Sequence, residues 1–375
     1  MNEEAIYCLA LSHIKGINLR QLKLLYEEVG SAKELLTHIP SLKERCENIQ
    51  PKAISLLSDG VGEALEFAKR EAEFCQKKGI QVLCMNDAAY PTRVRECEDA
   101  PLILFYRGTA NLNASRIVSM VGTRRLSEYG RDLCTMITRE LAQLLPDVLI
   151  VSGLAYGIDI ECHRGALGNG LETVAVLAHG LDRIYPDSHR KDSIAMLGQG
   201  GLLTEYPINT IPEKGNFVRR NRIVAAMCDA CIVVETPSHG GSMITAGLAF
   251  DYSREVFACP GRCTDVKSKG CNQLIGNQSA HIFTSTEDFL EKMGWKSHKE
   301  VERQLQNGIQ RDLFSNLTSE QQAIADALAD SEGKAVDELS RLLNRRVQEV
   351  ASNLFELELQ GLVRLLPGGV YRLIR

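Results

Sequence analysis

The chain has 375 residues, of which 44% are hydrophobic and 24% charged, and its formal net charge is −5. This length allows roughly two or three domains. The composition is that of an ordinary soluble globular protein, and no segment reaches the roughly 20 consecutive apolar residues that a membrane helix needs. The acidic amino terminus, Met1 to Glu4, lacks the charge pattern of a signal peptide, so we expect a cytoplasmic protein without membrane contact.

Residues 1–75 predict a helical domain. Apolar residues recur at helical spacing over 6–14 and again over 19–29, with a turn at Gly16 between them. Two short helices joined in this way are typical of helix-hairpin-helix or SAM-like domains, the first of which grip the DNA backbone. Residues 1–36 contain four basic and five acidic residues. An α-hairpin used only for packing is therefore the favoured interpretation.

Residues 76–290 predict a Rossmann-like α/β domain with a mostly parallel sheet. Helical patterns such as 131–145 and 159–167 separate most of its apolar, β-branched runs. Continuous apolar strands with crossover helices between them indicate a sheet covered on both faces. The expected strands are Val82–Cys84, Ile103–Phe105, Ile117–Val121, Val148–Val151, Val174–Leu177, Leu202–Thr204, Cys231–Val234 and Val256–Ala258.

Residues 291–315 are polar and charged without a strand-like run, which predicts a linker. Residues 316–375 then show three helical patterns and two apolar runs around Pro367-Gly-Gly369, the order of a winged helix. The three helices are expected over Ser319–Leu328, Val336–Leu343 and Arg346–Leu359. This segment has seven basic and nine acidic residues. Because attraction to phosphates needs positive charge, we favour a protein partner over direct DNA contact.

Twelve cysteines are scattered along the chain, several inside apolar runs, as expected for reduced thiols in a reducing compartment. Two groups raise the question of zinc: the C-x-x-C segment 228–231, and Cys259, Cys263 and Cys271 with His281 nearby. A structural zinc site needs a full set of convergent ligands. The C-x-x-C segment spans the start of an expected buried strand, where alternate side chains point in opposite directions. We therefore expect no metal and no other cofactor.

The first of three glycine-rich turns follows the expected strand at Val121, at the strand-to-helix position where doubly wound sheets bind phosphates. Gly122 allows close approach of a ligand, and the amides from Thr123 onward would point outward at the start of the next helix. Ser127 can cap that helix or bond a phosphate. A purely structural turn explains the glycine and the serine but not the adjacent Arg124 and Arg125, so phosphate binding is favoured.

The second turn begins at Ser152 and Gly153, and it leads to Asp159 and His163, which share a helix face. An acid–base pair is the enzymatic interpretation of these two residues. A helix cap bonded to a structural histidine is favoured, because no serine, cysteine or further carboxylate completes a triad.

The third turn precedes a further helix and is expected to lie beside the other two at one edge of the sheet. Its candidate DNA-binding residues are Gly240, Gly241, Ser242 and Thr245.

The segment 214–222 concentrates charge around one aromatic residue. Its candidate DNA-binding residues are Lys214, Phe217, Arg219, Arg220, Asn221 and Arg222. Arginine offers a planar fork to phosphates, and an aromatic ring offers a face to a base. The structural alternative is a solvated basic start to a helix over 220–228, with one arginine paired to Glu205 or Glu235. We expect at least one of the three arginines to have this structural role.

Eight motifs, taken in this order, resemble the DprA/Smf family of DNA-processing proteins. They are Tyr90-Pro91, Val121-Gly-Thr-Arg124, Ser152-Gly-Leu-Ala-x-Gly-Ile-Asp159, Tyr185-Pro186, Phe217-x-x-Arg-Asn-Arg222, Gly241-Ser-x-Ile-Thr-Ala246, Cys259-Pro-Gly261 and Gly270-Cys-Asn272. The helical amino terminus and the winged helix also match the family architecture.

The resemblance implies a homodimer that binds single-stranded DNA without catalysis. It implies that this protein protects incoming DNA in natural transformation and loads a RecA-type recombinase onto it. Phosphate contacts would fall on Gly122, Thr123, Arg124, Lys214 and Arg220, with base stacking on Phe217. Two alternatives stay open: a Rossmann-like phosphoribohydrolase, and a scaffold that binds proteins only. The hydrolase is disfavoured because Ile244-Thr-Ala-Gly-Leu248 lacks the glutamate that follows the corresponding turn in such enzymes.

Overall fold

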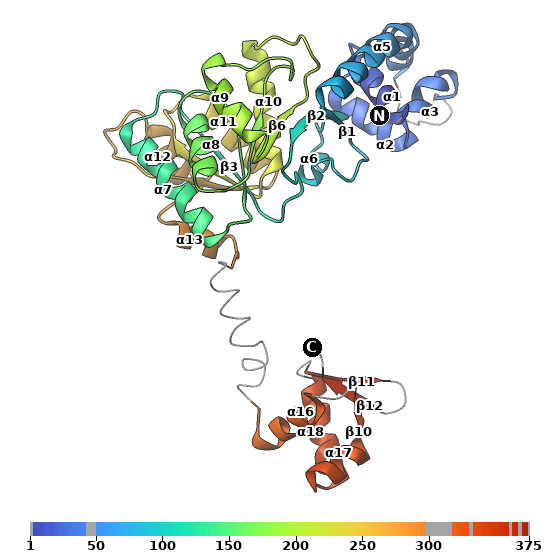
Figure 1. Cartoon of the computed structure of the whole chain (residues 1–375), viewed down its shortest axis with the longest axis vertical. Coiled ribbons are helices and arrows are strands. Elements are labelled where there is room, and N and C mark those ends of the chain that lie inside the picture. The colour runs from blue at the N-terminus through green and yellow to red at the C-terminus, as the bar shows by residue number, and fades with distance from the viewer. Residues whose placement is uncertain are drawn as a thin grey trace. The chain divides into compact units, whose positions relative to one another are not determined.

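Figure 1 shows the computed structural model of the chain, which forms two compact units, residues 1–298 and 299–375. The structure describes residues 3–42, 50–296, 317–329, 333–359, 362–366 and 370–373. Each unit has its own hydrophobic core. Within the described residues, no helix combines the length and the apolar character that crossing a membrane requires.

The amino-terminal helices of the first unit pack beside one end of the sheet (Figure 1). They are α1 (Glu3–His13), α2 (Leu19–Val29), α3 (Ala32–Thr37), the 3₁₀ turn η1 (Ile39–Ser41) and α5 (Pro51–Lys78). The buried Lys23 of α2 ties this region to the chain that follows β1, because its Nζ donates to Arg95 O (2.7 Å) and Cys97 O (2.8 Å). Gly16, with φ +93°, faces the Leu56 side chain of α5, so the turn between α1 and α2 lies against another helix.

The sheet has nine strands in the order β1-β2-β6-β5-β4-β3-β7-β8-β9. They are β1 (Gln81–Cys84), β2 (Ile103–Gly108), β3 (Ile117–Gly122), β4 (Leu149–Ser152), β5 (Thr173–Val176), β6 (Gly200–Thr204), β7 (Ala230–Glu235), β8 (Glu255–Ala258) and β9 (His281–Ile282). From β6 to β9 every neighbouring pair is parallel, whereas β2 pairs antiparallel with β1 and β6. All eight predicted strands are present. The exposed two-residue β9 was not predicted, because it gives no apolar run.

Both faces of the sheet are covered by helices, as the continuous apolar strands predict. In β3, Ile117 and Val121 join one hydrophobic cluster while Val118 and Met120 join the other, since successive side chains point to opposite faces. The first cluster includes residues of α10 (Lys214–Met227), α11 (Gly241–Asp251) and α12 (Lys269–Gly276). The second includes residues of α7 (Glu128–Leu144), α8 (Ile158–Gly168) and α13 (Thr286–Lys292).

The short helices complete the connections of the first unit. They are α6 (Thr92–Arg95), the 3₁₀ turn η2 (Asp187–His189) and α9 (Arg190–Met196). In a smaller cluster, Met196 of α9 packs with residues of β5 and β6.

The strand order reverses direction at β3. The chain runs through β4, β5 and β6 on one side of β3 and then returns to β7 on the other side. Open α/β sheets bind ligands at such a point, outside the carboxyl ends of the strands. The turns that begin at Gly122 and at Thr236, after β3 and β7, are therefore the ones that the topology places at a binding crevice.

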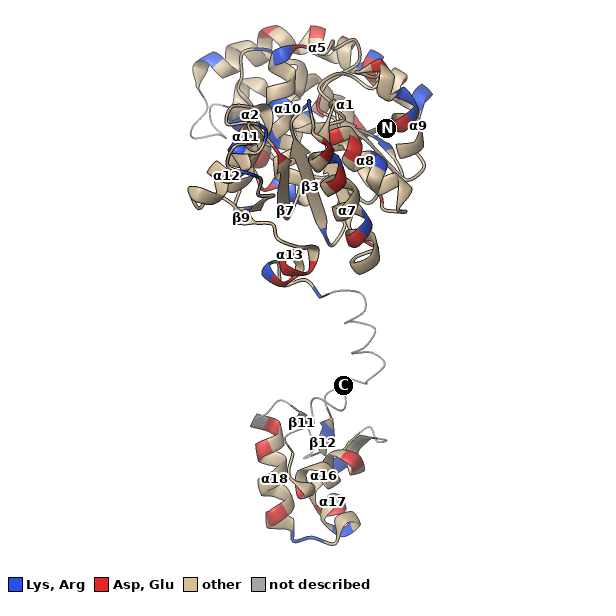
Figure 2. Cartoon of the chain, turned by 90° about the vertical axis from the view of Figure 1, so that its left-hand side faces the viewer, with Lys and Arg blue, Asp and Glu red and all other residues tan. Residues whose placement is uncertain are grey.

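The second unit has the predicted winged-helix arrangement. Its elements are α16 (Ser319–Ala329), β10 (Lys334–Ala335), α17 (Val336–Leu343), α18 (Val347–Leu359), β11 (Val363–Leu366) and β12 (Val370–Leu373). The strands form a sheet in the order β10-β12-β11, and Ile324, Leu339 and Leu354 lie in the core. The predicted turn at 367–369 and residues 297–315 of the predicted linker lie outside the described residues. Figure 2 shows acidic residues along α18, which agrees with the acidic composition of this segment.

Candidate nucleic-acid interface

A cleft of about 750 Å³ lies at the carboxyl ends of β3, β4 and β7. It brings together thirteen of the seventeen predicted site residues: Gly122, Thr123, Arg124, Arg125, Gly153, Lys214, Phe217, Arg220, Asn221, Gly240, Gly241, Ser242 and Thr245. Among the remaining lining residues, Tyr185 and His239 carry polar rings that were absent from the prediction, and Asp159 carries a carboxylate. The three glycine-rich turns therefore converge on one edge of the sheet, as predicted.

The face of α10 that lines the cleft begins earlier than predicted. The helix starts at Lys214 rather than at residue 220, directly after the Pro212-Glu213 pair. Lys214, Phe217 and Arg220 are three residues apart and therefore share one face of α10. The predicted start at residue 220 was wrong, since Gly215 and Asn216 are helical although both are poor helix formers. The solvated basic start considered for residues 220–222 was also wrong, because Arg220 and Arg222 are buried.

Arg220 is buried against the ends of two strands. Its Nη1 donates to Gly153 O (2.5 Å) and to Val176 O, and its Nε donates to Asn221 Oδ1 (3.2 Å). Burial lowers the pKa of the guanidinium to about 10, while the nearby Asp159 carboxyl acts in the opposite direction. Arg220 is therefore cationic at neutral pH, and its partners among the described residues are neutral oxygens rather than an ion-paired carboxylate.

Phe217 lies between two guanidinium groups and a second aromatic ring. Arg124 Cζ is 5.1 Å from the centroid of the Phe217 ring, and Arg220 Cζ is 6.0 Å from it. Such distances are typical of cation–π contacts. The ring of Tyr185 lies 5.8 Å from that of Phe217 at an interplanar angle of 56°, and Tyr185 is 46% exposed. The cleft thus presents an accessible aromatic corner.

The cleft is positive although the whole chain is acidic. The lining includes four cations, Arg124, Arg125, Lys214 and Arg220, and a single carboxylate, Asp159. Within the described part of the chain, the exposed Arg124, Arg125 and Lys214 side chains form no ion pair. Asp159 is almost buried, and burial raises its pKa while Arg220 opposes that shift. The cations outnumber the acid, which favours an anionic ligand.

In the turn after β3, three of the backbone amides that were predicted to point outward are bonded within the protein. Thr123 N donates to Glu235 O (2.7 Å), Arg125 N to Thr123 Oγ1 (3.2 Å) and Ser127 N to Glu235 Oε2 (2.9 Å). Ser127 Oγ also donates to Glu235 Oε1 (2.6 Å) and caps α7 by accepting from Gly130 N (3.2 Å). Ser127 is therefore a structural cap outside the cleft. These three amides already have protein partners, so they are not free to bind a ligand.

The turn after β4 packs closely against the turn after β3. Gly157 has φ +81°, and a Cβ there would lie 2.1 Å from Thr123 O, so a side chain at this position would separate the turns. Ser152 is fully buried and donates its Oγ to Met120 O (2.6 Å). The prediction of Ser152 as a ligand contact was therefore wrong, whereas Gly153 lines the cleft.

The hydroxyls of the third turn support its backbone. Ser242 Oγ donates to Thr236 Oγ1 (2.7 Å), and Thr245 Oγ1 donates to Gly241 O (3.1 Å). Asn221 Nδ2 also donates weakly to Gly241 O (3.4 Å), which links α10 to this turn.

The remaining two arginines of the motif lie outside the cleft lining. Arg222 is buried and forms an ion pair with Glu205, and its Nη1 donates to Asp99 O (2.6 Å). The expectation that one arginine would pair with Glu205 or Glu235 is therefore confirmed, and the prediction of Arg222 as a DNA contact was wrong. Arg219 is exposed on α10 but is not part of the cleft lining.

The structure does not form the acid–base pair considered for the second turn. His163 Nδ1 is 2.7 Å from Thr173 Oγ1, and no described residue hydrogen-bonds its Nε2. Burial lowers the pKa of His163 to about 3. Asp159 is not the cap of α8, since Gly157 occupies that position, and its Oδ2 accepts from Ala155 N (3.4 Å). The histidine is structural, as favoured, but its expected bond to a capping Asp159 is absent.

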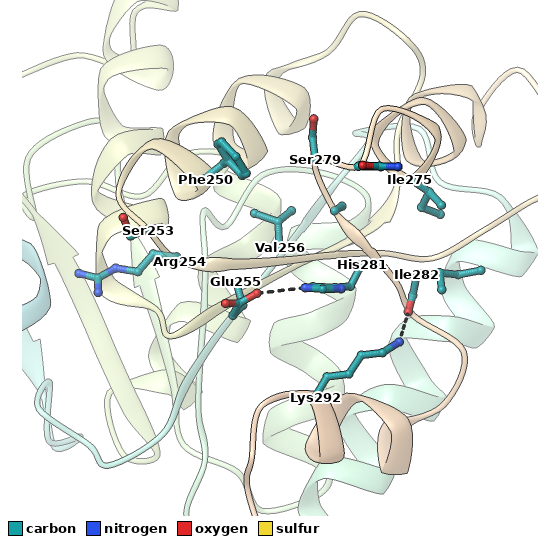
Figure 3. Close-up of a pocket in the computed structure, with 12 residues that line it drawn as sticks. Phe250, Ser253, Arg254, Glu255, Val256, Ile275, Ser279, His281, Ile282 and Lys292 are labelled. Atoms are coloured by element: carbon teal, nitrogen blue, oxygen red, sulfur yellow. Dashed lines mark hydrogen bonds and ion pairs between the residues drawn. The ribbon is translucent and has the colours of Figure 1, made fainter.

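A second hollow, of about 700 Å³, lies at the β8–β9 edge of the sheet (Figure 3). Its His281 Nε2 is 3.3 Å from Glu255 Oε2, and Lys292 Nζ donates to Ile282 O (3.5 Å). In this hollow His281 and Lys292 have protein partners, whereas Arg124, Arg125 and Lys214 of the cleft form no ion pair within the described residues. Within the described residues, no cluster of His, Cys, Asp or Glu side chains could hold a metal ion.

Comparison with known proteins places this geometry in a family. Residues 81–294 match the family "DNA recombination-mediator protein A", and residues 314–369 match the DprA winged helix domain. The Smf protein of Synechocystis is 30% identical over an alignment that covers 99% of both chains. The X-ray structure of DNA processing protein A from Streptococcus pneumoniae has 32% identity and a TM-score of 0.65, and the match covers 78% of this chain and 98% of that one.

A second solved structure, from Helicobacter pylori, is described as giving insight into the single-stranded DNA binding mode of DNA processing protein A. It has 30% identity and a TM-score of 0.52, and the match covers 57% of this chain and 95% of that one. The sequence match over most of both chains and the shared architecture agree. The chain therefore belongs to the DNA recombination-mediator protein A family, also named DprA/Smf.

Proposed function

We propose that this protein binds single-stranded DNA in the cleft, without catalysis and without a requirement for a particular sequence. One observation carries the proposal: Arg124 and Arg220 lie against an accessible aromatic side chain, Phe217, and Lys214 lines the same cleft at the carboxyl edge of the sheet. A positive groove with a stacking surface is the combination that sequence-independent binding of single strands uses. The described binding mode of the Helicobacter pylori relative supports the same ligand.

The cleft offers separate groups for the phosphates and for the bases of a DNA strand. The exposed Arg124, Arg125 and Lys214 are proposed to neutralise phosphates, and Phe217 and Tyr185 to stack against bases. Arg220 has a different role, because its guanidinium is committed to Gly153 O and Val176 O. It supplies fixed positive charge beneath the strand. Stacking accepts every base, so sequence preference is expected to be small.

A phosphoribohydrolase is the enzymatic alternative. The segment Ile244–Leu248 of α11 has no acid, and His163 is buried away from Asp159 in a bond to Thr173. These features disfavour acid–base chemistry at the cleft. Incubation with nucleoside monophosphates, followed by chromatography for free base, tests this alternative, and release of base would support it over pure binding.

From the family resemblance we further propose that the protein acts as a homodimer in the cytoplasm. In this role it would protect incoming DNA during natural transformation and load a RecA-type recombinase onto the strand. Light scattering measures the oligomeric state. Recombinase filament formation on a single strand, with and without this protein, tests the loading step, and no acceleration would contradict it.

The third possibility is a scaffold in which the winged helix or the amino-terminal helices bind proteins only. The winged helix is a compact unit of its own, so the chain without residues 316–375 is expected to keep its affinity for single strands. Retained affinity would assign DNA binding to the first unit and leave the second for a protein partner. Loss of all binding on this deletion would contradict a cleft in the first unit as the DNA site.

The test of the proposed function is a gel shift with single- and double-stranded oligonucleotides of equal length. The double variant Arg124→Glu/Lys214→Glu reverses two exposed cleft cations, and Arg372→Glu reverses an exposed cation of β12 as a control. We expect the double variant to lose most of the single-strand affinity and the control to keep it. Affinity should also fall steeply with salt. Equal, small losses in both variants would contradict the proposal.

A further inference from the structure

The loop between β8 and α12, residues 259–268, is a basic segment beside the cleft that the proposed function has not yet used. Together with Lys269, the first residue of α12, it carries Arg262, Lys267 and Lys269 but only one acid, Asp265. We call these three cations the basic rim. Arg262 and Lys269 are exposed, and within the described residues neither forms an ion pair.

The basic rim is continuous with the walls of the cleft. Lys267 Nζ donates to Leu126 O (3.3 Å) in the turn after β3, and Tyr129 Oη donates to Pro260 O (2.7 Å). Gly270 N donates to Thr236 O (2.8 Å) in the turn after β7. Because β8 is the parallel neighbour of β7, this loop leaves the same edge of the sheet, about 10 Å from β3.

The loop holds its cations in a defined place. Asn272 Nδ2 donates to Gly261 O (3.0 Å), and Gly261 N donates to Asn272 Oδ1 (3.1 Å), so one side chain bonds both backbone groups of the same residue. Ser268 is buried where the loop enters α12. A loop anchored at both ends gives up little conformational entropy when its side chains meet a ligand.

The opposite end of the cleft, towards β5 and β6, does not offer such a surface. Three of the four cations there are paired with neighbouring acids, Arg164 with Asp192 (3.0 Å), Arg183 with Asp182 (2.8 Å) and Arg190 with Asp187 (3.6 Å), and only Lys191 forms no ion pair within the described residues. A phosphate that approached these arginines would also meet the carboxylates. The charge pattern therefore favours one direction of exit from the cleft.

We propose that a single DNA strand longer than the cleft continues onto the basic rim, where Arg262 and Lys269 contact its phosphates. This inference rests on the proposed function, and it assigns both the direction of the strand and an additional binding surface. Val266, which is 66% exposed in the middle of the loop, offers an apolar contact to a sugar or a base at this position.

The test compares a short oligo-dT of about 6 nucleotides with a long one of about 15 by fluorescence anisotropy. The double variant Arg262→Ala/Lys269→Ala removes the two exposed rim cations, and the matched control Arg190→Ala/Lys191→Ala removes one arginine and one lysine of α9. We expect the rim variant to bind the short strand like wild type and the long strand about tenfold more weakly at 0.15 M salt. Its salt slope on the long strand should fall by about 1.4.

Two outcomes would overturn the basic rim as a strand contact. One is a rim variant that binds the long strand like wild type and with the same salt slope. The other is an equal loss on short and long strands, or in the rim and control variants alike. If the proposed function itself is wrong, the result is different: wild type binds neither the short nor the long strand. The variant Arg124→Glu/Lys214→Glu then does not differ from wild type.

Discussion

The guanidinium group of Arg220 lies where a side chain on residue 153, a glycine, would otherwise be. Arg220 Nη1 donates to Gly153 O at 2.5 Å, and a Cβ atom on residue 153 would lie 2.6 Å from Arg220 Cζ. The absence of a side chain at the end of β4 is therefore what allows a guanidinium to occupy the floor of the cleft. The residues are 67 positions apart in the chain, and neither one alone indicates the arrangement.

The variant Gly153→Ala should displace the Arg220 guanidinium from the floor of the cleft and weaken single-strand binding about fivefold, as expected when one positive charge moves away from the strand. The atoms that a new methyl group meets belong to the end of a flexible side chain, so the fold should survive. Anisotropy with oligo-dT measures the affinity, and urea denaturation measures the free energy of unfolding. Gly168→Ala is the control, because no heavy atom lies within 4 Å of its added Cβ. Equal affinities for the two variants would contradict the role of Arg220.

The variant Phe217→Leu keeps an apolar side chain but removes the aromatic face. We expect a loss of about 1–3 kcal/mol in binding, which corresponds to about 5- to 150-fold in the dissociation constant. The salt slope should stay unchanged, because stacking releases no counterions. Phe250→Leu, at a phenylalanine that is 59% exposed in the second hollow, is the control. A change in salt slope instead of affinity would contradict stacking on Phe217.

The variant Arg222→Met should lower stability rather than binding. Arg222 and Glu205 are both largely buried, and removing one partner of a buried pair leaves an uncompensated charge that costs about 3–5 kcal/mol. Urea denaturation should show this loss, while the folded fraction keeps its affinity for single strands at low temperature. Arg219→Met, at an exposed position of the same helix, should change the free energy of unfolding by less than about 0.5 kcal/mol. A stable Arg222→Met protein that fails to bind would reverse this assignment.

His163 should make the fold sensitive to acid. Its pKa is lowered to about 3 in the folded protein by burial, against about 6.5 in an unfolded chain. Below pH 6.5 His163 is therefore protonated in the unfolded state but stays neutral in the folded state, and the free energy of unfolding falls as the pH drops. Between pH 7 and pH 5 this residue should cost about 2 kcal/mol.

The measurement is urea denaturation at both pH values for wild type and His163→Gln. The variant should lose about 2 kcal/mol less between pH 7 and pH 5 than wild type does, whatever its stability at pH 7. The buried His179 has a lowered pKa in both proteins, so its contribution cancels. Identical pH dependence in the two proteins would show that His163 is not a buried neutral histidine.

The sequence predicts the sheet and the edge that carries the site because both follow from local patterns. Each of the eight apolar runs forms a strand, and each glycine turn follows one. The strand β9 was not predicted because its two residues, His281 and Ile282, are exposed and do not form an apolar run. The start of α10 was not predicted because Gly215 lowers helix propensity, whereas in the structure Arg220 bonds the ends of two strands and holds the helix against the sheet.

Which arginine of α10 pairs with an acid and which lines the cleft could be predicted only in part. That one of them pairs with Glu205 follows from the need to neutralise a buried acid, but the identity of that residue depends on the rotation of the helix. Arg220 and Arg222 are two residues apart and therefore lie on different faces of α10, but the sequence does not say which of the two faces meets the sheet. Tyr185 was missed as a cleft residue, since its ring meets Phe217 only through a loop that no periodicity describes.

Glu235 gives the turn after β3 an unusual chemistry for a phosphate-binding position. This buried residue satisfies the amides of Thr123 and Ser127 by its carbonyl and its carboxylate, so these groups cannot serve as a rigid socket for one phosphate. The groups that the proposed function assigns to this turn are the long, exposed side chains of Arg124 and Arg125. In the proposed complex, a strand held by these side chains meets no socket built from the Thr123 and Ser127 amides to fix its register, so it could advance by single nucleotides while it stays attached. Such freedom is consistent with the proposed transfer of the strand to a recombinase.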